Sequence, residues 1–198
     1  MATRDYKGPV VFTGENPGLT LYAPGGDRIV AAASYWHCTY SAHGEGDALE
    51  IWVADADGQP GWRAIYADNA ALGRFVAATF NEHFADYRGQ GFATLEPTPA
   101  RFSQESDSRA YHRVACHGAD RRIVLEWRDV IDRRQIIGSG MALGGRSFEL
   151  ATVICPCAAG TIAIDDRPLA GAPRVGERDG HPQSSAFLAF AESWVENG

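Results

Sequence analysis

Residues 34–43 read SYWHCTYSAH, a stretch that is dense in aromatic and β-favouring residues and carries two imidazoles. Successive side chains of a strand point to opposite faces, so a strand here places Tyr35 and His37 on one side and Trp36 and Tyr40 on the other. A face that mixes aromatic rings with hydrogen-bonding groups suits an enclosed small-molecule site. The stretch therefore predicts a ligand pocket formed in part by a β-sheet.

Turn-forming residues punctuate the rest of the chain at short intervals, for example at 24–27 (PGGD) and 55–58 (DADG). Between them lie short runs rich in Val, Ile, Thr and aromatic residues, a pattern typical of strands joined by tight connections. The strands expected from this pattern are Val10–Thr13, Leu19–Ala23, Ile29–Ser41, Ala48–Ala54, Arg63–Tyr66, Gly91–Leu95, Ala110–Cys116, Arg122–Val130, Gln135–Ile137, Ser147–Cys155 and Gly160–Ile164.

Two segments have the residue spacing of helices. Asp68 or Asn69 can cap a helix that runs to about His83, in which apolar residues recur at steps of three and four. A second helix is expected over residues 184–196, where either of two serines can act as the cap. Both helices are expected to pack against the outside of the sheet or to close one end of it.

These elements predict a mainly β fold. About eleven strands in a single domain cannot lie in one flat sheet without exposing long edges, and closure removes the edges. We therefore predict that residues 1–198 form an antiparallel, lipocalin/calycin-like β-barrel with two helices, one mid-chain and one C-terminal. A β-sandwich or jelly roll is the alternative. The strand spacing resembles that of calycin-type barrels over most of the chain. This resemblance does not identify any functional residue.

The composition argues against several classes of function. The formal net charge is −7 and no run of basic residues is longer than two, which disfavours a nucleic-acid partner. The amino terminus is polar and lacks the apolar run of a signal peptide. No stretch is apolar for long enough to span a bilayer as a helix. We therefore expect a cytoplasmic protein without a membrane partner.

Four cysteines stand at positions 38, 116, 155 and 157. In the cytoplasm they are expected to remain thiols. Cys155 and Cys157 are separated by one proline, whereas a redox motif needs two intervening residues, and no second ligand pair completes a zinc site. The sequence also contains no dinucleotide fingerprint, phosphate-binding loop or nucleophile elbow. No metal and no cofactor are therefore predicted.

Three residues are candidates for proton transfer. His37 shares its strand face with aromatic and hydroxyl groups, which favours a position in a pocket. His112 and Glu126 lie in the hairpin 111–130. If Glu126 points into the barrel, burial would raise the pKa of its carboxyl and allow it to act as an acid or base. The alternative is a cross-strand ion pair with Arg113 or Arg128.

Five further residues are candidates for substrate binding. Tyr35 and Tyr40 can donate hydrogen bonds to a ligand oxygen, and Arg113 can stabilise a developing negative charge. Trp36 and Trp127 can line an apolar cavity, although most tryptophans of this chain are expected in the core.

These residues favour a protein that binds a small apolar or aromatic molecule. Acid–base groups in a pocket favour a cofactor-independent lyase, isomerase, cyclase or hydratase. A non-catalytic carrier or sensor of a hydrophobic small molecule is the main alternative, because the same barrel can serve both roles. A histidine-rich metal or haem protein is a further alternative. A homodimer is possible, and the sequence does not identify the ligand.

Overall fold

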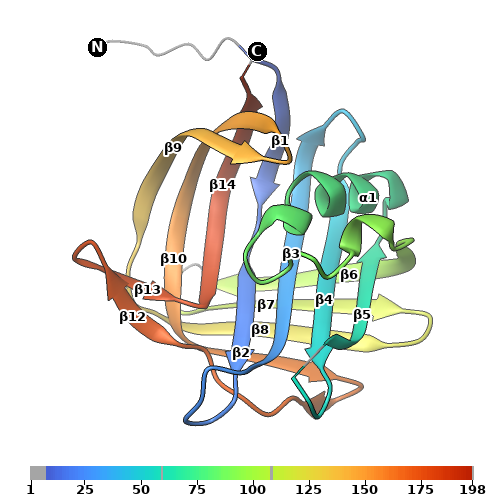
Figure 1. The fold of residues 1–198 in the computed structure, drawn as a ribbon, viewed down its shortest axis with the longest axis vertical. Coiled ribbons are helices and arrows are strands. Elements are labelled where there is room, and N and C mark those ends of the chain that lie inside the picture. Colours follow the sequence, from blue (N-terminus) through green and yellow to red (C-terminus); the bar gives the residue numbers. More distant parts are fainter. Residues whose placement is uncertain (1–7, 59, 108, 198) are drawn as a thin grey trace.

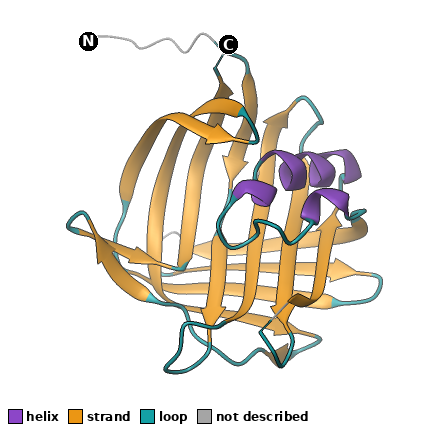
Figure 2. Ribbon diagram, viewed as in Figure 1, coloured by secondary structure: helices purple, strands orange, loops and turns teal. Residues whose placement is uncertain are grey.

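The computed structural model describes residues 8–58, 60–107 and 109–197. This part of the chain is mainly β, with one short α-helix and two 3-10 turns (Figure 1, Figure 2). The strands are β1 (Val10–Glu15), β2 (Gly18–Tyr22), β3 (Ile29–Ser41), β4 (Gly46–Ala54), β5 (Pro60–Ala67), β6 (Thr98–Asp107), β7 (Tyr111–Gly118), β8 (Arg122–Val130), β9 (Arg134–Leu143), β10 (Arg146–Ile164), β11 (Arg167–Pro168), β12 (Val175–Arg178), β13 (His181–Ser184) and β14 (Ala186–Glu196). The helical elements are α1 (Ala70–Thr79), η1 (Asn81–His83) and η2 (Phe92–Thr94).

Nine strands form a closed ring of hydrogen-bonded neighbours. Strands β2 to β5 pair in sequence order, and so do β6 to β8. Strand β8 pairs with β10, β10 pairs with β14, and β14 pairs with β2, which closes the ring. All these pairs are antiparallel except β5–β6, which is parallel and connects through α1 and the two 3-10 turns. The expectation of a wholly antiparallel ring is therefore wrong at this one pair.

Strand β10 connects two parts of the molecule. Its second half, from Cys157 onward, pairs with β8, whereas its first half pairs with β9 on one side and β14 on the other. Strand β1 pairs with both β14 and β3. Figure 1 shows β9, β10 and β14 as a curved wall beside β3–β5, while β6–β8 cross behind. The wall therefore has one face toward the ring interior and another toward the helical segment.

Two cores lie on opposite faces of β3. Tyr35 packs inside the ring with Leu49 and Trp127, and Trp36 packs on the other face with Phe80 and Trp194. The alternation expected within residues 34–43 is therefore present at Tyr35 and Trp36, and both faces are buried there because each is covered by other elements, whereas Thr39 and Tyr40 near the strand end are exposed. Strands that are buried on both sides carry nearly continuous apolar runs. The C-terminal segment 186–196 has such a run.

The mid-chain helix begins where the sequence predicts. The Asn69 side chain accepts hydrogen bonds from the backbone N–H groups of Ala71 and Leu72, which satisfies two donors that the first turn leaves free. Its amide nitrogen donates to the carbonyl oxygens of His43 and Glu45. The cap therefore also ties the helix to the turn between β3 and β4. The α-helix ends at Thr79, and η1 continues it as a 3-10 turn to His83.

The predicted C-terminal helix is wrong, because residues 186–196 form strand β14. Most positions of this segment are at least half-buried, on both faces of the strand. An apolar run of this kind has no clear period, so spacing alone does not distinguish a helix from a strand.

Other boundaries also differ from the expected ones. Residues 92–94, expected in a strand, form η2, and the two strands expected between 147 and 164 are one strand. Strand β6 was not predicted, because it is largely exposed and polar and contains a proline. In the part of the chain described, no helix combines the length and the apolar character required to cross a bilayer.

Candidate functional site

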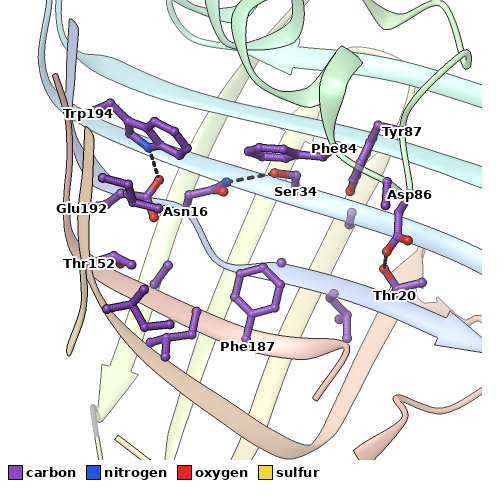
Figure 3. A pocket seen from close by; sticks show the side chains of 18 of the residues that line it. Asn16, Thr20, Ser34, Phe84, Asp86, Tyr87, Thr152, Phe187, Glu192 and Trp194 are labelled. Carbon is purple, nitrogen blue, oxygen red and sulfur yellow. Dashed lines mark hydrogen bonds between the residues drawn. The ribbon is translucent and has the colours of Figure 1, made fainter. Parts of the chain in front are cut away.

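A cavity of about 340 Å³ lies between the β10–β14 wall and the segment 84–87 that follows η1 (Figure 3). We call it the Glu192 cavity. Its walls are mostly apolar, and its buried polar side chains are few. The apolar lining includes Phe84, Met141, Leu150, Ile154, Phe187 and Trp194. The lining residues with polar side chains are Asn16, Thr20, Ser34, Asp86, Tyr87, Thr152 and Glu192.

A β-bulge in β14 determines which side chains face this cavity. Val153 pairs with Phe190 and Ala151 pairs with Ser193, so two residues of β14, Ala191 and Glu192, stand opposite Thr152 alone. Ala191 has a φ of 49°, in the left-handed region. The extra residue reverses the face to which each following side chain of the strand points. Side chains 187 and 189 face the cavity before the bulge, and side chains 192 and 194 face it afterwards.

The bulge places an ionisable carboxyl in an apolar setting. Glu192 is only 4% exposed. The indole nitrogen of Trp194 donates a hydrogen bond to Glu192 Oε1 at 2.6 Å. No salt bridge to Glu192 forms within the described residues. Burial raises the pKa of Glu192 to about 7, and the side chains of Trp194 and Thr152 partly oppose this effect. Near neutral pH the group can therefore either donate or accept a proton.

Asn16 and Ser34 lie beside this carboxyl. The Asn16 amide nitrogen donates to Ser34 Oγ and to the Tyr35 carbonyl oxygen, both at 2.9 Å. Figure 3 shows Asn16 between Glu192 and Ser34. Because the Ser34 oxygen accepts from Asn16, its own hydrogen remains available for a ligand atom. Glu192 and Ser34 thus offer hydrogen bonds to a ligand in a mostly apolar cavity, whereas the Thr152 hydroxyl donates to the Phe190 carbonyl oxygen at 3.3 Å.

The segment opposite the wall is fixed to the sheet by polar contacts. The Thr20 hydroxyl donates to Asp86 Oδ2 at 2.5 Å, and the Trp52 indole nitrogen donates to the Asp86 carbonyl oxygen at 2.9 Å. The ring of Phe84 stacks on Trp36, with their planes 15° apart. These contacts hold the cover in place, so the cavity is largely pre-formed, as small-molecule sites usually are.

A second buried carboxyl, that of Glu50, lies on the strand next to Ser34. Glu50 on β4 is the direct cross-strand neighbour of Ser34 and is fully buried. Burial raises the pKa of Glu50 well above the usual range, and nearby Asn81 opposes this only in part. Neither carboxyl oxygen of Glu50 has a hydrogen-bond partner. We therefore expect Glu50 to be protonated at neutral pH.

Of the eight candidate residues, Tyr35, Trp127 and His112 are buried, and His37 is partly exposed beside Tyr35. The Tyr35 hydroxyl donates to Asp47 Oδ1 at 2.5 Å, and His37 Nδ1 donates to the same oxygen at 2.8 Å. His112 is buried, and its ring lies 5.5 Å from that of Trp127. Burial, reinforced by the charge of His37, lowers the pKa of His112 to about 4, so its imidazole is neutral at pH 7.

The other four lie elsewhere. Glu126 forms ion pairs with Arg113 (3.2 Å) and Arg128 (3.0 Å), which corresponds to the ion-pair alternative. Tyr40 is 55% exposed, and Trp36 packs in the core beneath α1. None of the eight residues lines the Glu192 cavity. Their proposed catalytic and binding roles remain predictions.

Sequence reasoning did not identify the polar groups of the cavity. A signal for Glu192 exists, because it is the one carboxylate in the run 186–195, which is otherwise almost entirely apolar. The helical interpretation placed it away from the buried face. Asn16, Ser34 and Thr152 carry no comparable signal, since each stands alone in an ordinary strand or turn.

Comparison of this chain with protein-family models, with curated proteins and with solved structures finds no match. Among the described residues, no group of three or more His, Cys, Asp or Glu side chains is arranged to hold a metal ion.

Proposed function

We propose that this protein binds a small apolar or aromatic molecule in the Glu192 cavity and exchanges a proton with it through the Glu192 carboxyl. One observation carries the proposal: a mostly apolar cavity of about 340 Å³ has a single buried carboxyl in its wall, with a pKa raised to about 7. The volume is near the lower end of the range for small-molecule sites, which favours a compact ligand.

The chemistry that suits this arrangement is cofactor-independent proton transfer. A carboxyl whose pKa is close to the working pH is an efficient general acid or base. Its protonated form can donate to a ligand oxygen, and its ionised form can remove a proton from an adjacent carbon. The hydroxyl group of Ser34 can donate a hydrogen bond where negative charge develops. Lyase, isomerase, cyclase and hydratase reactions on a small molecule all use these steps.

A non-catalytic carrier is the second candidate. It is favoured by the same pocket if protonated Glu192 serves only as a hydrogen-bond donor to the ligand. In either role we propose that the ring is a calycin-like barrel. The sequential pairing of β2–β5 and of β6–β8 supports this, whereas the parallel β5–β6 pair distinguishes the ring from a simple up-and-down barrel.

Substitution of Ala189 by Phe is expected to weaken the binding of a neutral apolar probe. Ala189 lines the cavity and is 2% exposed, so a ring at this position occupies the space that a ligand needs. With N-phenyl-1-naphthylamine as the fluorescent probe, we expect the dissociation constant to rise at least tenfold. The matched control is Ala142→Phe on β9, where the side chain is exposed. Equal binding by the two variants would show that the cavity is not the ligand site.

Replacement of Glu192 by Gln separates an enzyme from a carrier. The amide keeps the shape of the side chain and cannot release a proton. A panel of small aromatic ketones is incubated with the protein in D2O, and deuterium uptake beside the carbonyl is followed by NMR. We expect the parent to catalyse uptake in a ketone that it binds, and the variant to lose at least 100-fold in rate while it binds within a few-fold. Binding without uptake in the parent would favour the carrier.

A further inference from the structure

The β10–β14 wall has a second hollow on the face opposite the Glu192 cavity. This hollow, of about 550 Å³, is lined by Arg109, Arg133, Val153, Cys155 and Phe190. Val153 and Cys155 alternate along β10 with Thr152 and Ile154, which line the Glu192 cavity. The two hollows are therefore separated by the thickness of one sheet, and their linings are chemically different.

The polar side of this hollow is cationic. Arg109 lies in the turn between β6 and β7, and Arg133 lies in the connection between β8 and β9. Arg133 Nη2 donates to the Arg109 carbonyl oxygen at 2.7 Å, which ties the two segments together. Both residues are exposed. Within the described residues neither guanidinium forms a salt bridge, whereas the adjacent Arg134 is paired with Asp132.

The other side of the hollow is apolar and lies next to the buried imidazole of His112. Cys155 is 2% exposed and forms part of the floor with Val153 and Phe190. Behind Phe190, at 6.0 Å between ring centroids, lies His112. His112 is 1% exposed, and neither of its ring nitrogens has a hydrogen-bond partner. An unpartnered buried polar group is rare in a folded protein, and this imidazole lies next to the apolar floor of the hollow.

We propose that this hollow is a second ligand site, which binds a small aromatic or aliphatic carboxylate. Arg109 and Arg133 hold the charged group, and Val153, Cys155 and Phe190 contact the apolar body. The planar guanidinium presents donors in a fork that matches a carboxylate. The apolar floor favours an organic anion over an inorganic one. A long polyanion is disfavoured, because the chain as a whole has a net charge of −7. This site does not depend on the function proposed for the Glu192 cavity.

The test uses naphthalene-1-carboxylate as the probe, with the full-length protein and isothermal titration calorimetry. We expect saturable binding at one site that weakens as salt is added. Arg109→Gln and Arg133→Gln should each weaken binding at least tenfold. Arg109→Lys should weaken binding less than Arg109→Gln, because lysine keeps the positive charge but lacks the paired donors of the guanidinium. The matched control is Arg101→Gln, an exposed arginine on β6, which should leave binding unchanged. Thermal melts establish that each variant is folded.

Two further measurements locate the probe. Ala189→Phe blocks only the Glu192 cavity and should not change the affinity for the carboxylate. In the parent protein, ring resonances of His112 should shift on titration, whereas those of the exposed His117 should not. The proposal is overturned if naphthalene-1-carboxamide, which has no charge, binds equally well. It is also overturned if Ala189→Phe and the arginine variants lose binding alike, or if no saturable binding occurs.

Discussion

Deletion of Ser193 is expected to abolish the native fold, whereas deletion of Ala191, two residues earlier, is expected to preserve it. Ser193 occupies a regular position that pairs with Thr13 on β1 and Ala151 on β10. Its removal turns the following side chain, Trp194, to the opposite face of the sheet. The indole then leaves the core that it forms with Phe80 and its neighbours. Truncation of a buried Trp typically costs about 3–5 kcal/mol, a large share of a typical domain's stability.

Ala191 differs because it is the extra residue of the bulge. It is exposed and left-handed, and its removal leaves Phe190 and Glu192 as ordinary neighbours on opposite faces. A left-handed conformation costs a residue other than glycine about 1–2 kcal/mol, which the deletion recovers. Circular dichroism and urea unfolding of the two deletion variants measure the difference. Loss of structure in the Ala191 variant together with a folded Ser193 variant would show that the bulge is wrongly placed.

The second large effect is the pH dependence of stability. The pKa of Glu192 is raised from its usual value of 4.5 to about 7 in the folded protein. Between these values the folded protein binds a proton that the unfolded protein has released. The free energy of unfolding therefore falls as pH rises from about 4.5 to about 7, and the contribution levels off above that. At about 1.4 kcal/mol per pH unit, the full difference is roughly 3 kcal/mol.

Glu192→Gln should remove this part of the pH dependence. Urea unfolding at pH 5.5 and 8.5 is expected to show a loss of stability in the parent that is smaller in the variant by roughly 2 kcal/mol, because about 1.5 pH units separate pH 5.5 from the raised pKa of about 7. Glu50 contributes a change of the same sign, but it is present in both proteins and cancels in the comparison. The matched control is Glu177→Gln on the exposed hairpin β12–β13. Parallel pH profiles for the parent and the Glu192 variant would contradict a buried, protonated carboxyl.

Elements whose signals are local can be predicted from the sequence of this chain. Residues 29–41 and 122–130 form strands with the predicted bounds, because β-favouring composition and flanking turns lie within the segment itself. Asn69 is the helix cap for the same reason, since the cap and the donors that it satisfies are within three residues of one another. Strand β6 was missed because its partners, and not its exposed polar residues, determine its conformation.

The candidate site shows the same division. Of the eight candidate residues, alternation along β3 correctly separates Tyr35 from Trp36, which pack in different cores on opposite faces of the strand. Glu192 was missed because a bulge opposite Thr152 of β10, which is distant in sequence, determines which side chains of β14 face the cavity. The spacing of apolar residues within 186–196 does not reveal this bulge.

The sequence by itself determined that this protein is mainly β, where most turns fall, and which residues of β3, β7 and β8 share a face. These properties follow from side-chain alternation and turn chemistry, which act over a few residues. The tertiary structure alone decided that the C-terminal segment is a strand and that one inserted residue turns Glu192 and Trp194 toward a cavity. The physical reason is that burial on both faces erases the local pattern, and the bulge is defined only by the partner strand.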